Sequence, residues 1–364
     1  MDPLLILFIH LGLGGVQRKI VDIVNYLRDC RPNQPITILL RNKEDFDLSR
    51  EIKNPQVKII VYSDWVKIKI PFFFPLFVVY KIWQIRPKAI LAFLDFVSLP
   101  CIWARILLFW RRFRLILSED HYASKVISGF KLGKLRNFLV KMFYPFADVI
   151  FTCSQATKED LIRSYGLPRK KIKIIRNWTT FTTRKVKRKE IYDLIYIGRM
   201  YKTKNLDFLI RALKKIKKLR KTIKLCLMGD GQEKNKLKAL VRKLKLQKNI
   251  TFFKPRLDVE NLLAKAKIFV LVSQRTVEGF PIIILEAMAT KTPVLTTDFA
   301  GAREFLKDSE NCYLFKNEGE FIKKAILLLN NHQARDKISE KAYNYVKRYH
   351  SSQNILDYLK ELNL

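Results

Sequence analysis

Short apolar runs recur along the first half of the chain, with patterns of helical spacing between them. The runs fall at Leu4–Ile9, 36–40, 57–61, 89–93, 114–117 and 149–152. Runs of about four to eight apolar residues are typical of strands that are buried on both faces of a parallel sheet. The helical patterns fall at 16–28, 72–84, 97–109 and 134–146. This alternation predicts a doubly wound α/β domain over residues 1–178.

The same alternation resumes after a polar and basic run, Thr179–Glu190, which we interpret as an interdomain linker. Strand patterns follow at 193–197, 225–228, 250–253, 268–272 and 294–297, and helical patterns at 318–331 and 333–347. With 364 residues, the chain is long enough for two hydrophobic cores. The sequence therefore predicts a second α/β domain over 191–349.

The stretch Glu278–Leu295 has the pattern of a loop, a helix, a turn and a strand. Pro281 suits the first helical turn, where its missing N–H costs nothing, and the helix is predicted to end near Ala289. Glu278 then lies at the mouth of the helix, while Glu286 lies inside an apolar helix where an unpaired carboxylate is costly to bury. The free N–H groups of the first turn can face an anion or a sugar hydroxyl. The alternative is a capping acid and an acid on the helix surface.

Two other strand ends carry candidate binding residues. Gly198 and Arg199 follow a strand, and Lys204 stands five residues after Arg199. An arginine fork and a mobile lysine charge suit a diphosphate leaving group, whose negative charge grows as its bond breaks. The alternative is a pair of surface cations beside a turn. Gly14 and Gly15 follow the first strand and allow the backbone to approach a ligand, although a tight strand–helix turn explains them as well.

The formal net charge of +37 is extreme and has two explanations. Lysines on helical patterns such as 211–221 and 234–248 form solvated faces, or the excess attracts an anionic partner. A membrane or another anionic acceptor is favoured over nucleic acid, because no nucleic-acid module appears in the chain. Val66–Tyr80 and Trp103–Arg114 mix basic and aromatic residues, which suits either core helices with snorkelling ends or an element at the lipid interface.

Targeting and redox signals are weak. Leu4–Ile9 is too short for the apolar core of a signal peptide, and the longer apolar run 70–80 is too short to span a bilayer. The five cysteines are widely spaced and form no C-x-x-C pair, which suits a reducing compartment and argues against a metal or disulfide framework.

Glu278-Gly-Phe-Pro-x4-Glu286-Ala-Met-Ala-x2-Thr-Pro-Val resembles the E-x7-E motif of glycosyltransferase family 4, which comprises retaining enzymes of the GT-B fold. Three further segments are similar to family motifs: the Gly-Gly-x-x-Arg loop at 14–18, Gly-Arg-x4-Lys-Asn at 198–205, and the glycine turn at 229–231. The resemblance implies an α/β chain with two Rossmann-like domains that face a cleft. It also implies that a final segment, 350–364, packs back toward the N-terminal domain.

The resemblance implies a role for each matching residue. Glu278 would touch the donor sugar, Glu286 would hold the ribose hydroxyls, and Arg199 and Lys204 would bind the diphosphate. His121 follows the strand at 114–117, at the position of a family histidine near the reactive centre, and is the fourth predicted catalytic residue beside Glu278, Arg199 and Lys204. The predicted donor-binding set comprises Gly14, Gly15, Gly198, Arg199, Lys204, Gly229, Glu278, Gly279, Phe280, Pro281, Ile282 and Glu286.

The implied activity is retaining transfer of a sugar from a nucleotide-diphosphate sugar to a glycan or lipid-linked acceptor, in surface polysaccharide or glycolipid synthesis. No Asp-x-Asp clamp is evident, so neither a metal nor another cofactor is expected. The enzyme is expected in the cytoplasm, peripheral on the inner face of an anionic membrane, with no nucleic-acid partner. The alternatives are another GT-B enzyme, such as a sugar-nucleotide epimerase, and a non-catalytic basic binding protein.

Two positions depart from the family pattern. Lys291 and Cys312 stand where the family commonly has glycine. A left-handed backbone at either position would be strained by about 1 kcal/mol for a residue with a side chain. We therefore expect altered loop geometry there, without an effect on the catalytic groups.

Overall fold

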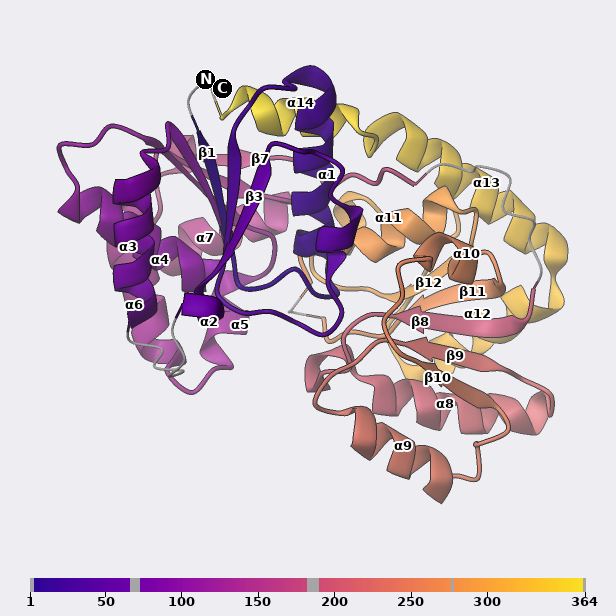
Figure 1. Cartoon of the computed structure of the whole chain (residues 1–364). Helices are drawn as coiled ribbons and strands as arrows, with labels where there is room; N and C mark the ends of the chain where they lie inside the picture. Colours follow the sequence, from indigo (N-terminus) through magenta and orange to yellow (C-terminus); the bar gives the residue numbers. More distant parts are fainter. Residues whose placement is uncertain (1–2, 66–72, 182–189, 276–277, 363–364) are drawn as a thin grey trace. The chain divides into compact units, whose positions relative to one another are not determined.

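The computed structural model describes residues 3–65, 73–181, 190–275 and 278–362. It divides into two compact units: unit 1 comprises Met1–Arg176 and Gln353–Leu364, and unit 2 comprises Asn177–Ser352 (Figure 1). Much of the predicted linker falls on 182–189 and part of the aromatic segment Val66–Tyr80 falls on 66–72, both outside the described residues.

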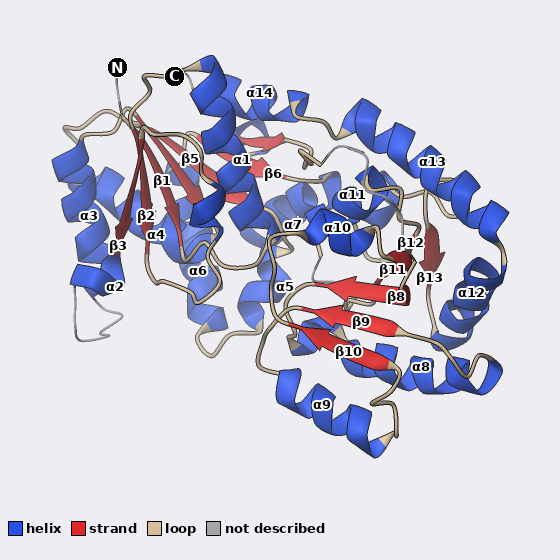
Figure 2. Ribbon diagram, turned by 45° about the vertical axis from the view of Figure 1, so that its right-hand side comes forward, coloured by secondary structure: helices blue, strands red, loops and turns tan. Residues whose placement is uncertain are grey.

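Unit 1 is built on a parallel sheet that has seven strands within the described residues, in the order β3-β2-β1-β4-β5-β6-β7 (Figure 2). The strands are β1 (Leu4–Phe8), β2 (Ile36–Leu40), β3 (Val57–Val61), β4 (Ala89–Phe93), β5 (Arg114–Glu119), β6 (Val149–Thr152) and β7 (Ile172–Ile174). β1 and β4 are fully buried, as their apolar runs predicted. In the central register, Ile6 pairs with Ile38 on one side and with Leu91 on the other.

Helices cover both faces of this sheet. The elements are α1 (Gly15–Cys30), η1 (Leu48–Glu51), α2 (Tyr62–Trp65), α3 (Phe74–Ile85), α4 (Asp95–Leu107), α5 (Ala123–Ser128), α6 (Gly133–Phe143), η3 (Tyr144–Phe146), α7 (Gln155–Tyr165), η4 (Arg169–Lys171) and α14 (Gln353–Lys360). The chain runs outward from β1 to β3 and then in the opposite direction from β4 to β7. Right-handed crossovers therefore place α1 on one face and α3, α4, α6 and α7 on the other (Figures 1 and 2).

The last helix, α14, belongs to unit 1 although the residues before it belong to unit 2. The ring of Tyr358 lies 4.4 Å from that of Phe151 and 6.5 Å from that of Phe93. The Nζ of Lys19, on α1, lies 5.6 Å from the Tyr358 ring centre. α14 thus completes the face of the sheet that α1 covers.

Unit 2 repeats the design with a parallel sheet that has six strands within the described residues, in the order β10-β9-β8-β11-β12-β13. The strands are β8 (Tyr192–Ile197), β9 (Leu225–Met228), β10 (Ile250–Phe253), β11 (Ala266–Leu271), β12 (Val294–Thr297) and β13 (Tyr313–Phe315). The helices are η5 (Lys202–Lys204), α8 (Leu206–Leu219), α9 (Lys234–Lys243), α10 (Val259–Leu263), α11 (Ile282–Ala289), η6 (Ala302–Glu304), α12 (Glu318–Asn330) and α13 (His332–Tyr349).

The observed elements agree with the predicted strands and helices except at short or mixed segments. β7 and β13 are additional three-residue strands. The segment Trp103–Arg114 is only partly helical, because α4 ends at Leu107 and β5 begins at Arg114. No helix in the described part of the chain is both long and apolar enough to cross a bilayer.

Of Lys291 and Cys312, the two residues that stand where the family commonly has glycine, only Lys291 has a left-handed backbone. Lys291 has φ 55°, as expected for a position where glycine is common. Cys312 does not have a positive φ, so that expectation is wrong. The left-handed residue of its turn is Ser309, with φ 62°, whose N–H donates to the Cys312 carbonyl at 2.8 Å.

Candidate active site

Each sheet has one point where neighbouring strands lead in opposite directions along the sheet. In unit 2 this point lies between β8 and β11, because β8 leads to β9 and β10 while β11 leads to β12 and β13. In unit 1 it lies between β1 and β4. Ligands of open α/β sheets bind outside the carboxyl ends of the strands at such points. The predicted site residues of each unit follow strands at this edge.

In unit 2, the loops after β8 and β9 touch through their backbones. Gly198 donates its N–H to the Met228 carbonyl at 3.0 Å, and Gly229, with φ 146°, donates its own to Phe253 at 3.1 Å. A Cβ at position 229 would lie only 1.9 Å from the Gly198 carbonyl oxygen. The glycine is therefore required by the close approach of the two loops as well as by its backbone angle.

The central polar contact of this edge is the ion pair between Lys204 and Glu278. Lys204 is carried by η5, and Asn205 ends that turn in the left-handed conformation with φ 54°. Glu278 is only 8% exposed. Burial raises the pKa of Glu278, but the charges of Lys204 and Arg199 outweigh this effect and the net pKa lies below the ordinary value. Glu278 is therefore an ionised acceptor.

Arg199 lies at the same edge and is half-buried. The buried Tyr196 donates its hydroxyl to the Arg199 carbonyl at 2.8 Å and so fixes the loop from below. Burial and then the charge of Glu278 raise the pKa of Tyr196 well above its ordinary value, so the phenol stays protonated as a donor. Motif matching did not identify Tyr196, although its position in an apolar strand marked it as a buried polar group that needs a partner.

Ring packing and a hydrogen bond to Phe280 fix the loop Gly279–Pro281. The buried Phe280 ring lies 4.3 Å from the ring of Phe305 and 5.5 Å from that of His350. Asn177 donates its amide to the Phe280 carbonyl at 2.7 Å, and His350 Nδ1 lies 2.7 Å from the Asn177 carbonyl oxygen. The Phe280 side chain thus belongs to the core of unit 2.

α11 follows with Pro281 as its N-cap and Ile282 as its first residue, so the proline stands one position earlier than predicted. The helix ends at Ala289 as predicted. Ile282 and Glu286 are both buried, and every residue of α11 except Ile283 is buried. Glu286 is therefore not an acid on the helix surface, which removes the alternative that the sequence left open.

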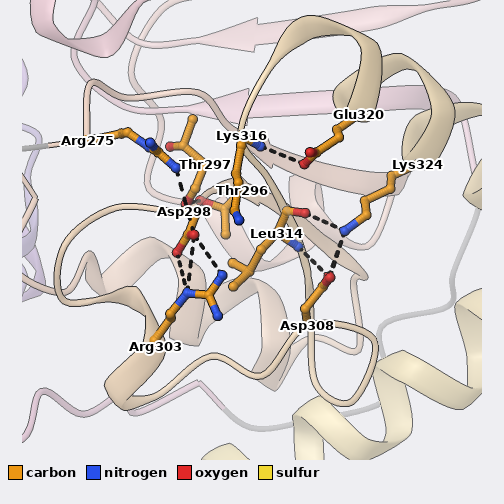
Figure 3. A network of polar contacts seen from close by, with 10 residues as sticks. All are labelled: Arg275, Thr296, Thr297, Asp298, Arg303, Asp308, Leu314, Lys316, Glu320 and Lys324. Carbon is orange, nitrogen blue, oxygen red and sulfur yellow. Dashed lines mark hydrogen bonds and ion pairs between the residues drawn. The ribbon is translucent and has the colours of Figure 1, made fainter.

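A second polar network braces the loop after β12 (Figure 3). Asp298 accepts from Arg303 Nη2 at 2.9 Å, and its carboxylate lies 3.8 Å from Arg275 Nη2. The Ala300 N–H donates to the Arg275 carbonyl at 3.0 Å. Asp308 accepts from Lys324 and from the Leu314 N–H, which secures the next turn. This network ties the loop after β12 to Arg275, in the loop that leads to Glu278.

In unit 1, the loop after β1 is closed by His10. Its Nδ1 accepts the Gly12 N–H at 3.0 Å, and its Nε2 lies 3.8 Å from Glu44. Gly14 precedes α1 and its carbonyl accepts the Arg18 N–H at 3.1 Å, while Gly15 is the first helical residue. The predicted pair of glycines thus lies at the open start of a 16-residue helix, at the carboxyl end of β1.

His121 follows β5 beside buried acids. Its Nδ1 lies 3.9 Å from Glu119 Oε2, and the other oxygen of Glu119 accepts the hydroxyl of Tyr144. Glu119 is fully buried, and burial together with the charge of Asp95 holds its pKa well above the ordinary value. Asp95 in turn accepts from Arg136 Nε at 2.7 Å. Sequence reasoning found the histidine and missed these partners.

A buried ion pair also ties α1 to this edge. Lys19, 1% exposed, donates to both oxygens of Asp120 at 2.9 Å. Within the described residues, the structure groups no three His, Cys, Asp or Glu side chains in a way that suits a metal ion.

Comparison with known proteins gives two family matches that together span most of the chain. Residues 179–345 match the model described as glycosyl transferases group 1, and residues 13–180 match that of glycosyltransferase family 4. The carboxyl-edge residues of both units therefore fall inside matched regions.

Two relatives and one solved structure are examples of the proteins to which the chain is similar. It is 26% identical, over 100% of both chains, to the Campylobacter jejuni N-acetylgalactosamine-N,N'-diacetylbacillosaminyl-diphospho-undecaprenol 4-alpha-N-acetylgalactosaminyltransferase. It is 29% identical, over 46% of this chain and 34% of the relative, to the Staphylococcus aureus poly(ribitol-phosphate) alpha-N-acetylglucosaminyltransferase. Anabaena HepE, solved with UDP and glucose, superposes with a TM-score of 0.81 at 19% identity over 99% of each chain.

Proposed function

Because the chain belongs to glycosyltransferase family 4 and has the GT-B fold, we propose that it is a retaining hexosyltransferase that uses a nucleotide-diphosphate sugar. The acceptor is a glycan carried by a lipid, and the enzyme works in surface polysaccharide or glycolipid synthesis on the cytoplasmic face of a membrane. The Campylobacter relative, whose name specifies a diphospho-undecaprenol acceptor, supports the acceptor class.

The observation that carries the proposal is the charge arrangement of the unit 2 edge. Arg199 and Lys204 follow β8, and Glu278 stays ionised beside Lys204. An arginine fork and an ammonium offset the charge that develops on a departing diphosphate. An ionised carboxylate accepts hydrogen bonds from sugar hydroxyls. Positioning and electrostatics then carry the reaction, and Glu286 holds the ribose.

In unit 1, the residues that we propose take part in the transfer are His121 and the glycine loop at Gly14 and Gly15. The imidazole Nδ1 lies 3.9 Å from Glu119 Oε2. An imidazole can exchange hydrogen bonds with the hydroxyls of a sugar. Retention follows from departure and attack on one face of the sugar, without a protein nucleophile.

Removing the two cations of unit 2 tests the donor site. Arg199→Ala with Lys204→Ala should weaken UDP or GDP binding at least about 100-fold, because two charge-assisted contacts contribute about 1.5–3 kcal/mol each. Calorimetric titration of the diphosphate measures the change. Lys202→Ala, an exposed lysine of the same turn, is the matched control and should leave affinity unchanged. Equal affinity in the wild type and the double variant contradicts the proposed donor site.

The proposed chemistry needs no metal, since cations of the protein meet the diphosphate charge. Sugar transfer should therefore continue in excess EDTA, at a rate within about twofold of the untreated enzyme. Loss of transfer that manganese or magnesium restores would show a metal-dependent mechanism.

The reaction products distinguish a transferase from the two alternatives, an epimerase and a non-catalytic binding protein. An epimerase would isomerise its sugar nucleotide without any acceptor, and a binding protein would bind nucleotide without turnover. Incubation with donor alone, followed by donor with lipid-linked acceptor, distinguishes these from a transferase by the species formed.

A further inference from the structure

The helical layer of unit 1 that α3, α4 and α6 form exposes large apolar side chains on the side that points away from the sheet. On α3 they are Leu76, Tyr80 and Trp83, and on α6 they are Leu135, Phe138 and Met142. Their spacings, i, i+4, i+7 and i, i+3, i+7, place each set on one side of its helix. Phe138 and Leu132, just before α6, are 58% and 62% exposed. We call this surface the outer face.

The outer face continues at the ends of α4 and α6. Phe109, in the turn after α4, is 81% exposed, and Trp110 and Phe146 are exposed beside it. The Trp103 ring packs at 6.1 Å against that of Phe143, which joins α4 to α6 from within the layer. Apolar patches of this extent on a soluble protein mark a surface that is covered in use.

The charged residues of α3 and α6 are all basic. α3 and α6 contain no acidic residue, and Lys134 and Lys141 flank the apolar stripe of α6. A groove in unit 1 joins the ends of α4 and α6. Of the described residues that line it, five are basic and one is acidic: Lys88, Arg105, Arg111, Arg112, Arg114 and Asp148. Arg105 pairs with Asp148. The groove therefore keeps a positive excess that suits phosphate groups.

Comparison with unit 2 shows that the high net charge alone does not place exposed apolar side chains among basic residues. α9 carries as dense a set of lysines as α6, yet none of its large apolar side chains is exposed. The lysines of α9 form a solvated face, whereas those of α6 frame aromatic and aliphatic groups. Exposed aromatics among cations are typical of elements that lie in the headgroup region of a bilayer.

We propose that the outer face of α3, α4 and α6 docks this protein on an anionic lipid leaflet. The apolar side chains enter the acyl boundary, while Lys134, Lys141 and the arginines of the groove contact lipid phosphates. This proposal rests on the proposed function, because an enzyme that acts on a lipid-linked acceptor has to work at the bilayer surface. Docking itself is measured without donor or acceptor.

Vesicle co-sedimentation of the full chain tests the docking surface. Vesicles of phosphatidylglycerol mixed with phosphatidylcholine should bind the wild type at low salt, and phosphatidylcholine alone should bind at least about tenfold less. Lys134→Glu with Lys141→Glu should weaken binding to anionic vesicles at least about tenfold, because each cation near the surface contributes on the order of 1 kcal/mol. Lys238→Glu with Lys243→Glu on α9 makes the same charge change and should bind like the wild type.

The apolar part of the surface needs its own variant. Leu135→Ser with Phe138→Ser alters two exposed side chains and should fold normally, which circular dichroism and thermal melting verify. Anionic vesicle binding should fall at least about tenfold while the net charge is unchanged. Failure of the wild type to bind, equal binding to both vesicle types, or an α9 variant as weak as the α6 variant overturns the proposal.

Two further outcomes identify other occupants or separate the two proposals. A dimer in light scattering that Leu135→Ser with Phe138→Ser dissociates, without vesicle binding, would assign the outer face to a second copy and reject the lipid. If the wild type binds vesicles but neither binds nor turns over any nucleotide sugar, the proposed function fails and the docking surface stands. Nucleotide binding without vesicle binding gives the opposite result.

Discussion

The carboxyl edges of the two sheets hold their acids in opposite ways. In unit 2, Glu278 is paired with Lys204 and its pKa is lowered by the surrounding cations. In unit 1, Glu119 is buried beside Tyr144 and Asp95, and its pKa is raised well above the ordinary value. One edge keeps its carboxylate charged. The other favours the neutral form of its acid. The same topology thus presents two different electrostatic environments.

Two glycines with positive φ, one in each unit, differ in how closely other atoms approach them. Gly229→Ala should lower the free energy of unfolding by about 3 kcal/mol or more, from overpacking and a disfavoured φ together. Chemical denaturation measures the change. Gly166→Ala is the matched control, because Gly166 has φ 67° in unit 1 but nothing lies within 4 Å of its added Cβ. It should cost about 1 kcal/mol. Equal losses in both variants would contradict the role of the Gly198–Gly229 contact.

Isosteric neutralisation of the two acids should shift the dependence of stability on pH in opposite directions. Glu278 has a lowered pKa, so its contribution is present above about pH 4.3 and is lost as the pH falls through its folded value. Glu278→Gln should lose roughly 1–2 kcal/mol at pH 7, and the loss should shrink below pH 4. Unfolding curves measured from pH 3 to pH 8 test this.

Glu119 has a raised pKa, so its contribution is present below about pH 4.3 and is lost as the pH rises through its folded value. Glu119→Gln should therefore gain stability relative to the wild type as the pH rises from pH 4 to pH 8. The same curves serve as the measurement. If the free energy of unfolding changed with pH in the same direction in both glutamine variants, the two edges would not differ as described.

The smallest effect concerns a strained turn in unit 2. Ser309 holds φ 62°, a conformation that glycine adopts without strain. Ser309→Gly should raise the free energy of unfolding by about 0.5–1 kcal/mol. Cys312→Gly, at the position where sequence reasoning expected the strain, should lower it, because Cys312 is buried. A gain at Cys312 rather than Ser309 would reverse the assignment.

The sequence predicted the fold well because the fold depends on local patterns. Apolar runs identified the central strands, and the resemblance to family motifs selected Arg199 and Lys204 after β8, and Glu278 and Glu286 between β11 and β12. The structure places Lys204 beside Glu278, although 74 positions separate them in the chain. What each of these residues does remains a proposal, which the experiments above test.

Supporting residues and the α6 part of the outer face could not be predicted in this way. Tyr144 acts on Glu119, and His350 acts on Asn177, only because folding brings distant segments together. The apolar stripe of α6 has the periodicity of an ordinary core-facing helix, so its spacing alone cannot reveal that it faces solvent. Only the layer formed with α3 and α4 shows which side of each helix is left uncovered.

The placement of α14 has a consequence for how the protein is made. Unit 2 lies between the two stretches of unit 1 in the sequence, yet Tyr358 packs on Phe93 and Phe151 and supplies part of the core of unit 1. During synthesis, unit 2 can therefore fold while unit 1 still lacks α14. Until α14 is made, Phe93 and Phe151 lack the aromatic ring that packs on them in the folded protein. Unit 1 is then completed only after unit 2 has been synthesised.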